Sequence, residues 1–388
     1  MLGKTNILFV SKNDASEAQL IHEKILTASS GNITKIEFLN NTIFVHTDAG
    51  ILRGTDVKSM DYIKKDGANL AATHFIFHAG KYYFCDASQE SQEKAVIYVT
   101  EDFSIYEEIV VEENGYISET EKVKFIIPGI FKDSRGRIVI MVRKMKGNVT
   151  YQLNLYIFDT FEKLSSADIV ICDNSEIADL HTGNAVLIKD RIFSRGGYYG
   201  TLSICSLDGK SHDAESKMYA NDYFFKYTTN NTSKTLDQVY KSFDGLNWSK
   251  VQTDTMDAYG EFYIFPLNGK TCLKYCDSQG TCYIKMADGV NKVGSSTNET
   301  FEIDIQEKIY SVAEDDEGNT YIGCSGGIIN KISLDKDGTT QLPDVQLVKT
   351  LAARQALTQA KQYTDEKVVE LKAYIDSKIE QNIEAGDV

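Results

Sequence analysis

Three cysteines stand close together in the second half of the sequence, at Cys272, Cys276 and Cys282. Structural zinc sites usually present paired C-x2-C knuckles, whereas the spacing here is C-x3-C-x5-C with no histidine close by. The segment DSQG, which separates the last two cysteines, has the composition of a hairpin turn. We therefore predict that these side chains are buried free thiols, and that the chain binds neither a metal ion nor another cofactor.

Two histidines, His74 and His78, lie four residues apart in the strand-like segment THFIFHAG. At the rise of a β-strand they share one face but are separated by roughly 13 Å, so a single metal ion cannot bind both. The glycine-rich stretches at 196–200 and 323–327 lack the lysine and the strand–loop–helix setting of a phosphate-binding loop. We interpret the histidines as packing residues and both glycine-rich stretches as hairpin turns.

The net charge and the length of the apolar segments exclude several classes of partner. A net charge of −15 argues against a nucleic-acid groove, which needs clustered lysine and arginine. No stretch approaches the roughly 18 apolar residues of a membrane span, and the run from Ile7 to Val10 is too short for a signal-peptide core. We therefore expect no membrane contact and no signal peptide. The odd number of cysteines, seven, adds to the expectation of synthesis in a reducing cytoplasm.

A turn of recurring composition occurs in the segment SFDGLNW, between two apolar strands. Its characteristic positions are Ser242, Asp244, Gly245 and Trp248. Aspartate and glycine suit a tight bend, and the serine and aspartate side chains can accept hydrogen bonds from turn amides. The turn recurs with fewer of the characteristic residues around Asp102, Asp208 and Asp288, and more loosely around Asp56, Asp159 and Asp335. The mean interval of about 46 residues is typical of a repeated unit of four short strands.

The pattern S-x-D-G-x-x-W in this turn is similar to the Asp-box of sialidase-type β-propellers. The resemblance implies an all-β fold, a seven-bladed β-propeller of four-stranded blades over residues 1–340, in which the Asp-box turns have a structural role. The strand-like segment Asn6–Val10 precedes the first blade and has no partner of its own. We expect it to complete the last blade, because an open sheet edge would otherwise template aggregation.

The same resemblance makes a sialidase-like carbohydrate-active enzyme the alternative function. Such an enzyme needs an arginine cluster that binds the substrate carboxylate, a tyrosine nucleophile and an acidic proton donor. The propeller segment holds six arginines, none of them in the Arg-Ile-Pro signature of these enzymes: Arg53, Arg135, Arg137, Arg143, Arg191 and Arg195. We therefore expect no enzymatic activity. Tyr198 and Tyr199 are candidate ligand-stacking aromatics of a carbohydrate-binding propeller, or else part of a blade core.

After Pro343 the composition changes to the helix-favouring residues Ala, Lys, Glu, Gln and Leu. Residues 341–388 are therefore predicted to form an α-helical tail with an apolar stripe at steps of three or four residues. The stripe comprises Val368, Leu371, Ile375 and Ile379. A single helix of this kind needs a partner, so we predict a coiled-coil or docking segment. It would form a homo-oligomer, with a trimer favoured, or bind another protein.

The tail segment ALTQAKQYTDEKVVELKAYIDSKI is similar to helical segments of tail-fibre and baseplate proteins in bacteriophages and phage-tail-like bacteriocins. The resemblance implies a non-enzymatic component of such a particle, assembled in the bacterial cytoplasm, that recognises a cell-surface ligand or scaffolds the tail tip. Its expected partners are copies of itself or other tail and baseplate proteins, with a bacterial surface glycan as the candidate receptor. A third class, an intracellular scaffold propeller, lacks the Gly-His and Trp-Asp signature of WD repeats.

Overall fold

The computed structural model describes most of the chain up to Asp335. The described residues are 7–12, 19–29, 31–86, 93–113, 116–118, 121–122, 124–146, 149–172, 180–196, 202–207, 211–214, 218–230, 235–251, 253–254, 256–257 and 262–335. The chain divides into two compact units, Met1–Leu334 and Asp335–Val388. The predicted tail helix lies outside the described residues, as does its apolar stripe, Val368, Leu371, Ile375 and Ile379.

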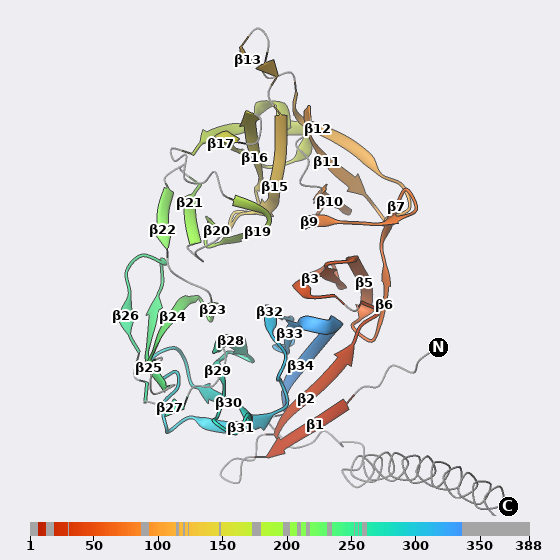
Figure 1. Ribbon diagram of the computed structural model, residues 1–388. Coiled ribbons are helices and arrows are strands. Elements are labelled where there is room, and N and C mark those ends of the chain that lie inside the picture. The colour runs from red at the N-terminus through yellow and green to blue at the C-terminus, as the bar shows by residue number, and fades with distance from the viewer. Residues whose placement is uncertain are drawn as a thin grey trace, which may run out of the picture. The chain divides into compact units, whose positions relative to one another are not determined.

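Among the described residues, the first unit is all-β and its strands form seven sheets of four or five strands and two two-stranded ribbons (Figure 1). Sheet 1 is β3(Ile33–Leu39), β4(Thr42–Thr47), β5(Gly50–Asp56) and β6(Ser59–Tyr62). Sheet 2 is β9(Ala72–His78), β10(Lys81–Asp86), β11(Lys94–Thr100) and β12(Glu107–Glu113). Sheet 3 is β15(Lys124–Lys132), β16(Ile138–Lys146), β17(Val149–Phe158) and β18(Asp168–Ile171).

The remaining sheets continue in chain order. Sheet 4 is β19(Leu180–Ile188), β20(Arg191–Gly196), β21(Leu202–Ser206) and β22(Ser211–Ala214). Sheet 5 is β23(Met218–Ala220), β24(Tyr223–Asn230), β25(Thr235–Ser242) and β26(Ser249–Lys250), with β27(Met256–Asp257) also on β25. Sheet 6 is β28(Tyr263–Leu267), β29(Lys270–Cys276), β30(Cys282–Ala287) and β31(Glu299–Ile303). Sheet 7 is β32(Ile309–Glu314), β33(Thr320–Cys324), β34(Ile328–Asp335), β2(Gln19–Leu26) and β1(Ile7–Lys12). The ribbons are β7(Lys64–Lys65) with β8(Ala68–Asn69), and β13(Tyr116–Ser118) with β14(Glu121–Lys122).

Two kinds of turn make the hairpins. Five sheets join their first two strands by a two-residue turn in which both central residues have positive φ, as a type I′ turn requires. These pairs are Asn40-Asn41, Ala79-Gly80, Lys189-Asp190, Asn221-Asp222 and Asn268-Gly269. Asparagine, aspartate and glycine tolerate this left-handed conformation best, so most of these turns follow directly from local sequence.

The second kind of turn is built on an aspartate followed three residues later by glycine. It begins at Asp133, Asp277 and Asp315, and the glycines have φ of 78°, 84° and 81°. In each, the carboxylate Oδ1 accepts hydrogen bonds from the backbone N–H groups two and four residues later, at 2.7–3.0 Å. Our sequence reading followed a different set of aspartates and did not recognise this repeated turn.

Strands of sheets 2 and 3, 3 and 4, 5 and 6, and 6 and 7 pack against each other, and β32 of sheet 7 packs against β3 of sheet 1. Sheets 1 and 2 share an apolar core, and sheets 4 and 5 are joined by hydrogen bonds from Lys189 and Arg191. The series of sheets is therefore closed. Four-stranded sheets of consecutive antiparallel strands in a closed series are the architecture of a β-propeller. The all-β propeller prediction is thus confirmed at this level.

Two of the contacts between sheets differ in composition. Between sheets 1 and 2, Phe44 packs against aromatic rings of its neighbour, and we call this group the aromatic interface: Phe44, Phe75, Tyr82, Phe84 and Phe103. Between sheets 6 and 7 the core holds four cysteines among aliphatic residues and two phenylalanines, Phe265 and Phe301. We call the following residues the cysteine interface: Cys272, Cys276, Cys282, Ile322 and Cys324.

One edge of the sheets is held together by hydrogen bonds between successive turns. Each bond joins a residue at or near the first hairpin turn of one sheet to the next sheet. They are Lys132 Nζ to Phe77 O (2.5 Å), Ser134 N to Asp190 Oδ1 (2.7 Å), Lys189 Nζ to Asp222 O (2.6 Å), Asn221 Nδ2 to Thr271 Oγ1 (2.8 Å) and Asn268 N to Gly318 O (3.0 Å). This edge is consequently fixed by polar contacts as well as by apolar packing.

The prediction that Asn6–Val10 completes the last blade was wrong in its choice of strand. Gln19–Leu26 (β2) is the strand hydrogen-bonded to β34, and Ile7–Lys12 (β1) pairs only with β2 at the edge of the sheet. The reason is burial: Leu20 and Ile25 are fully buried, one in the cysteine interface and one between sheets 7 and 1. The segment QLIHEKIL contains charged residues and no continuous apolar run, so a prediction based on apolar runs did not identify it as a strand.

The glycine-rich turn at 323–327 serves this closure. Gly327 has φ of 70°, and a Cβ atom there would lie 1.8 Å from the carbonyl oxygen of Ser29. Its N–H donates to Gly31 O at 2.6 Å, and its carbonyl accepts from Thr27 N at 2.9 Å. Glycine is required because the segment after β2 crosses the turn at backbone contact distance.

Within the described part of the chain, no helix has the length and apolarity needed to cross a membrane.

Candidate functional site

A pocket of about 530 Å³ opens between sheets 1 and 2, beside the aromatic interface. Sheet 1 and the segment that follows it supply Thr42, Arg53, Gly54, Thr55, Asp61, Tyr62, Ile63 and Lys64, and the turn after β11 supplies Asp102 and Phe103. The lining therefore mixes both signs of charge with hydroxyl groups and two aromatic rings, those of Tyr62 and Phe103.

Arg53 occupies a defined position in this pocket. It lies on β5 directly opposite Asp61 on β6. Its Nη1 donates a hydrogen bond to the backbone oxygen of Asp102 at 2.9 Å, and its guanidinium carbon lies 4.8 Å from the centre of the Phe103 ring. A guanidinium carries five N–H donors, so this arrangement fixes the group and leaves further donors for a ligand.

Phe103 has an unusual backbone for its residue type. Its φ is 70°, in the left-handed region, whereas the turn of sheet 5 has Gly245 with φ of 77° after its aspartate. A bulky residue in this region costs about 1–3 kcal/mol. The conformation is held by a 2.9 Å hydrogen bond from Phe103 N to Thr100 Oγ1 and by packing of the ring in the aromatic interface. The ring is thereby placed under Arg53.

The two walls of the pocket are tied together by one hydroxyl group. The Tyr106 hydroxyl lies 2.9 Å from the backbone oxygen of Lys64, on the sheet 1 side, and 3.0 Å from that of Phe103, on the sheet 2 side. Asp102 is held in the same turn, because its Oδ1 accepts hydrogen bonds from the Ser104 hydroxyl and N–H. These bonds lower the pKa of Asp102, which is therefore ionised at neutral pH.

The pocket presents donors and acceptors in balance. Arg53 and Lys64 are cationic donors, Asp61 and Asp102 are anionic acceptors, and the threonine and tyrosine hydroxyls can do either. Sugar hydroxyls likewise both donate and accept, and a few fixed polar groups beside an apolar surface are typical of small-molecule sites. A polyhydroxylated ligand without net charge matches this lining.

The segment SFDGLNW of sheet 5, which resembles an Asp-box in sequence, forms a hydrogen-bonded turn. Ser242 Oγ accepts from Gly245 N at 2.9 Å and donates to Asp244 Oδ1 at 2.8 Å, and the same carboxylate oxygen accepts from Leu246 N and Asn247 N. Burial alone would raise the pKa of Asp244, but the hydrogen bonds from Asn247 and Leu246 outweigh it and lower the pKa.

Two further contacts connect this turn to its surroundings. Its Asp244 carbonyl accepts from Arg191 Nη1 of sheet 4 at 2.6 Å. Trp248 is only partly buried, with Lys226 Nζ 4.6 Å from the ring centre. The hydrogen bond from Arg191 joins this turn of sheet 5 to sheet 4, which is consistent with a structural role for the turn.

The other sequence-predicted positions are not brought together. Asp288 pairs with Lys270 at 2.8 Å, and its side chain is 91% exposed. Asp102 lines the pocket described above. Asp208, Tyr198 and Tyr199 lie outside the described residues.

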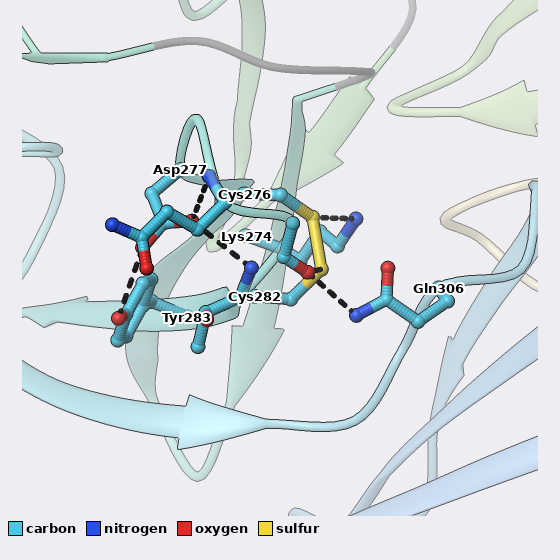
Figure 2. The surroundings of a disulfide bond; sticks show 9 residues. Lys274, Cys276, Asp277, Cys282, Tyr283 and Gln306 are labelled. Carbon is cyan, nitrogen blue, oxygen red and sulfur yellow. Dashed lines mark hydrogen bonds between the residues drawn. A yellow bond between two sulfur atoms is a disulfide. The ribbon is translucent and has the colours of Figure 1, made fainter.

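The cysteine hairpin differs from its prediction as free thiols. Cys276 and Cys282 face each other on β29 and β30 and form a disulfide bond, whereas Cys272 is a free, buried thiol (Figure 2). The physical reason is register: the five-residue turn between them places the two residues directly opposite each other, where their side chains are closest. Cysteine spacing alone does not reveal this.

The histidines are in packing positions, as predicted. The buried His74 ring lies 4.8 Å from the ring of Phe131, and His78 lies edge-on to Tyr83 and Phe161. Among the described residues, no three histidine, cysteine, aspartate or glutamate side chains are grouped so as to hold a metal ion.

Three arginines of the sequence analysis are engaged at separate places. Arg53 bonds to the turn of sheet 2, Arg137 pairs with Asp133 inside its own turn at 2.7 Å, and Arg191 bonds to the turn of sheet 5. Arg53 is the only arginine among the residues that line the pocket.

The pocket was not found from the sequence, although one signal was present. The Asp-turn of sheet 2 reads EDFS, where sheet 5 has FDGL. A phenylalanine in place of glycine at a position that needs positive φ departs from the motif, and such departures concentrate at functional sites. This signal would have singled out Phe103, though not Arg53.

No family model matches the chain, and no curated protein matches it in sequence. Several solved structures are similar in fold. One of YCF48 bound to D1 peptide has a TM-score of 0.49 at 10% identity, covering 84% of this chain and all of its own. Virginiamycin B lyase from Staphylococcus aureus has 0.42 at 12%, covering 81% and 99%. The WD40 β-propeller domain of Doa1 has 0.42 at 10%, covering 85% and 97%. At these values the similarity carries no inference about ligand or activity.

Proposed function

We propose that the chain is a non-enzymatic recognition component of a bacteriophage or phage-tail-like particle, and that the pocket between sheets 1 and 2 binds a bacterial surface glycan. The observation that carries the binding role is the pocket, in which a fixed guanidinium, two carboxylates, hydroxyl groups and two aromatic rings line one cavity. The particle setting rests on the resemblance of residues 356–379 to segments of tail-fibre and baseplate proteins.

The charges of the pocket favour a neutral sugar over an acidic polymer. The positive charges of Arg53 and Lys64 are balanced by the negative charges of Asp61 and Asp102. An anionic ligand would therefore be repelled by two carboxylates as well as attracted by two cations. Hydrogen bonds to charged groups contribute roughly 1.5–3 kcal/mol each, and a sugar can make several. Binding should therefore depend only weakly on salt.

The alternative of a sialidase-like enzyme fits the pocket less well. Such an enzyme grips a carboxylate with several arginines, and here Arg53 alone of the lining residues is an arginine. Hydrolysis also needs a carboxylic acid that is protonated near neutral pH, whereas the hydrogen bonds from Ser104 lower the pKa of Asp102. These observations support binding without turnover.

The proposal includes an architecture and an assembly. Each of the seven sheets would be one blade of a seven-bladed propeller, with β2 as the closing strand. The tail at 341–388 would form a helix whose stripe, Val368, Leu371, Ile375 and Ile379, makes a trimer or docks on another tail or baseplate protein. The particle would be assembled in the bacterial cytoplasm.

A binding experiment on the full-length protein tests this function. Purified protein is titrated with a panel of neutral and acidic bacterial wall glycans, and the products are analysed for hydrolysis. We expect binding of a neutral glycan without turnover, and at least a tenfold weaker affinity in Arg53→Gln, because a charged hydrogen-bond donor is lost. Arg135→Gln serves as the matched control, since Arg135 is exposed on sheet 3.

Two results would overturn the proposal. Hydrolysis of a sialoside or another glycan would establish the enzyme. An affinity for glycans that is unchanged in Arg53→Gln, with the melting temperature also unchanged, would place the site elsewhere on the molecule.

A further inference from the structure

The cysteine interface contains one pair of sulfur atoms in a defined setting. Cys276 and Cys282 stand opposite each other on β29 and β30, and the bond between them closes the hairpin at Asp277 (Figure 2). Cys85, Cys172, Cys272 and Cys324 are buried and not part of a disulfide bond. The described residues thus include one oxidised pair and several protected thiols.

A buried cation stands beside this pair. The Nζ atom of Lys274 lies 3.2 Å from Cys276 Sγ, and Lys274 is only 5% exposed (Figure 2). An ammonium group next to a sulfur atom stabilises the thiolate, which is the reactive form of cysteine. Burial instead raises the pKa of the Cys324 thiol to about 12 and also raises that of Cys272. Cys276 is therefore electrostatically distinct from the free thiols.

The two sulfur atoms also differ in access. Cys276 is 9% exposed and Cys282 is fully buried, so a small reagent reaches Cys276 first. The turn that separates them does not depend on the disulfide, because Asp277 Oδ1 accepts hydrogen bonds from Gln279 N and Thr281 N. The pair therefore stays opposed when it is reduced.

We propose that Cys276 and Cys282 form a reversible thiol–disulfide exchange site, in which Cys276 is the entry cysteine and Cys282 the resolving cysteine. The co-reactant is a small-molecule disulfide, RSSR. The Cys276 thiolate attacks one sulfur of RSSR and expels RS⁻, which gives a mixed disulfide on Cys276. Cys282 then attacks Cys276 Sγ, the bond between Cys276 and the SR group breaks, and the proton of the Cys282 thiol passes to the departing RS⁻. The protein loses two thiols, and RSSR becomes two RSH.

The site lies where its state affects the contact between sheets 6 and 7. Gln306, in the connection from β31 to β32, donates from Nε2 to the backbone oxygen of Gly280 in the hairpin at 2.8 Å (Figure 2). Oxidation fixes the hairpin that carries this acceptor and so strengthens the attachment of the connection. The inference is independent of the proposed function, because it holds for any location in which the chain moves from a reducing to an oxidising medium.

Thiol counting on the full-length protein tests the proposal. Protein reduced with dithiothreitol is incubated with oxidised glutathione or cystine and then reduced again. A sample from each stage is quenched by rapid alkylation, and its free thiols are counted. We expect two of the seven cysteines to become protected on oxidation, to map to Cys276 and Cys282, and to be released by the reductant while the protein remains folded. A pair that cannot be reduced without unfolding, or one that forms elsewhere, would overturn it.

The role of Lys274 is tested by rate. In Cys282→Ser, we expect oxidised glutathione to react with Cys276 about three- to tenfold faster than in the double variant that also carries Lys274→Met. Lys274→Arg should retain the fast rate. If Lys274→Met does not fold, the pH dependence of Cys276 alkylation in Cys282→Ser gives the same answer. A midpoint at or above the ordinary thiol value of about 8.5, or preferential capping of Cys282 in Cys276→Ser, would overturn the assignment of the entry cysteine.

Discussion

The aromatic interface and the cysteine interface occupy equivalent places between neighbouring sheets but are filled by different chemistry. The first uses large flat rings, and a ligand-sized pocket lined by polar groups opens beside them. The second combines aliphatic residues and two phenylalanines with four cysteines, two of which form a covalent bond inside one hairpin. Sheets of the same architecture can therefore pack through cores of different composition. A pocket has formed at one contact between sheets and a disulfide bond at another.

Each interface also contains one buried histidine with a different partner. His46, beside Phe75, lies 2.7 Å from Glu37 Oε2 and 3.2 Å from the carbonyl oxygen of Ala72, so it joins sheets 1 and 2. His22, on the closing strand β2, lies 2.8 Å from Asn330 Oδ1 on β34. One histidine thus contacts a carboxylate and the other an amide.

The largest effect is expected from removal of the closing strand. Deleting residues 1–26 exposes the edge of β34 and removes Leu20 and Ile25, each of whose burial contributes roughly 1.5–3 kcal/mol. We expect aggregation or a large fall in melting temperature, with hydrogen exchange accelerating first in sheets 6 and 7. Deleting only residues 1–12 removes an edge strand and should have a much smaller effect. Equal losses in both truncations would contradict the assignment of β2.

A core substitution in each interface is expected to have the next largest effect. Phe44 and Ile322 are both fully buried. Phe44→Ala should lower the free energy of unfolding by about 3–5 kcal/mol and weaken ligand binding, because the rings that support the pocket lose their centre. Ile322→Val should cost about 0.5–1.5 kcal/mol and leave binding unchanged. Chemical denaturation and glycan titration measure both quantities, and loss of binding in Ile322→Val would show that the interfaces are coupled.

Acid should weaken the two regions in different pH ranges. Burial lowers the pKa of His22 from 6.5, so its contribution to stability is present above that pH and is lost as pH falls below it. Burial alone would raise the pKa of Glu37, but Lys35 and His46 outweigh it and lower the pKa from 4.5 to about 2. The contribution of Glu37 is therefore lost only as pH falls below 4.5.

The melting temperature as a function of pH separates these contributions. We expect His22→Gln to flatten the curve just below pH 6.5 and Glu37→Gln to flatten it below pH 4.5. If His22→Gln leaves the slope in the upper range unchanged, His22 is not the group that titrates there.

The smallest effects are expected at the aspartate turns. Asp102 and Asp277 both accept hydrogen bonds from turn N–H groups, but only the second turn is closed by a disulfide. Asp277→Ala should therefore lower the melting temperature of the reduced protein more than that of the oxidised protein. Asp102→Ala should lower it equally in both. A reductant-independent effect of Asp277→Ala would show that the disulfide does not stabilise its turn.

Several features of the fold follow from local sequence. Turns such as Asn40-Asn41 and Asn268-Gly269 indicate hairpins, because few other residues tolerate positive φ. The alternation of strand-like segments and turns predicted four-stranded units. The closing strand was misplaced because its burial depends on sheets far away in sequence. For the same reason the disulfide was missed, since register and not spacing brings Cys276 opposite Cys282.

The candidate site was the least predictable part. Its lining comes from two sheets, and residues such as Arg53 and Asp102 are ordinary in their own segments. Only their juxtaposition across the aromatic interface creates a cavity, and the order of the sheets does not say which side chains of two neighbouring sheets meet. The anomalous Phe103 was the one local sign, because it stands where the turn geometry favours glycine.

The position of β34 has a mechanical consequence. This strand ends at Asp335, where the tail begins, and it is hydrogen-bonded on one side to β33 and on the other to β2. A load applied through the tail must shear two ladders at once, whereas a terminal strand at an open edge could be peeled away one hydrogen bond at a time. Because its first strands pair within its last sheet, the chain reinforces the point at which a force on the residues after Asp335 would act.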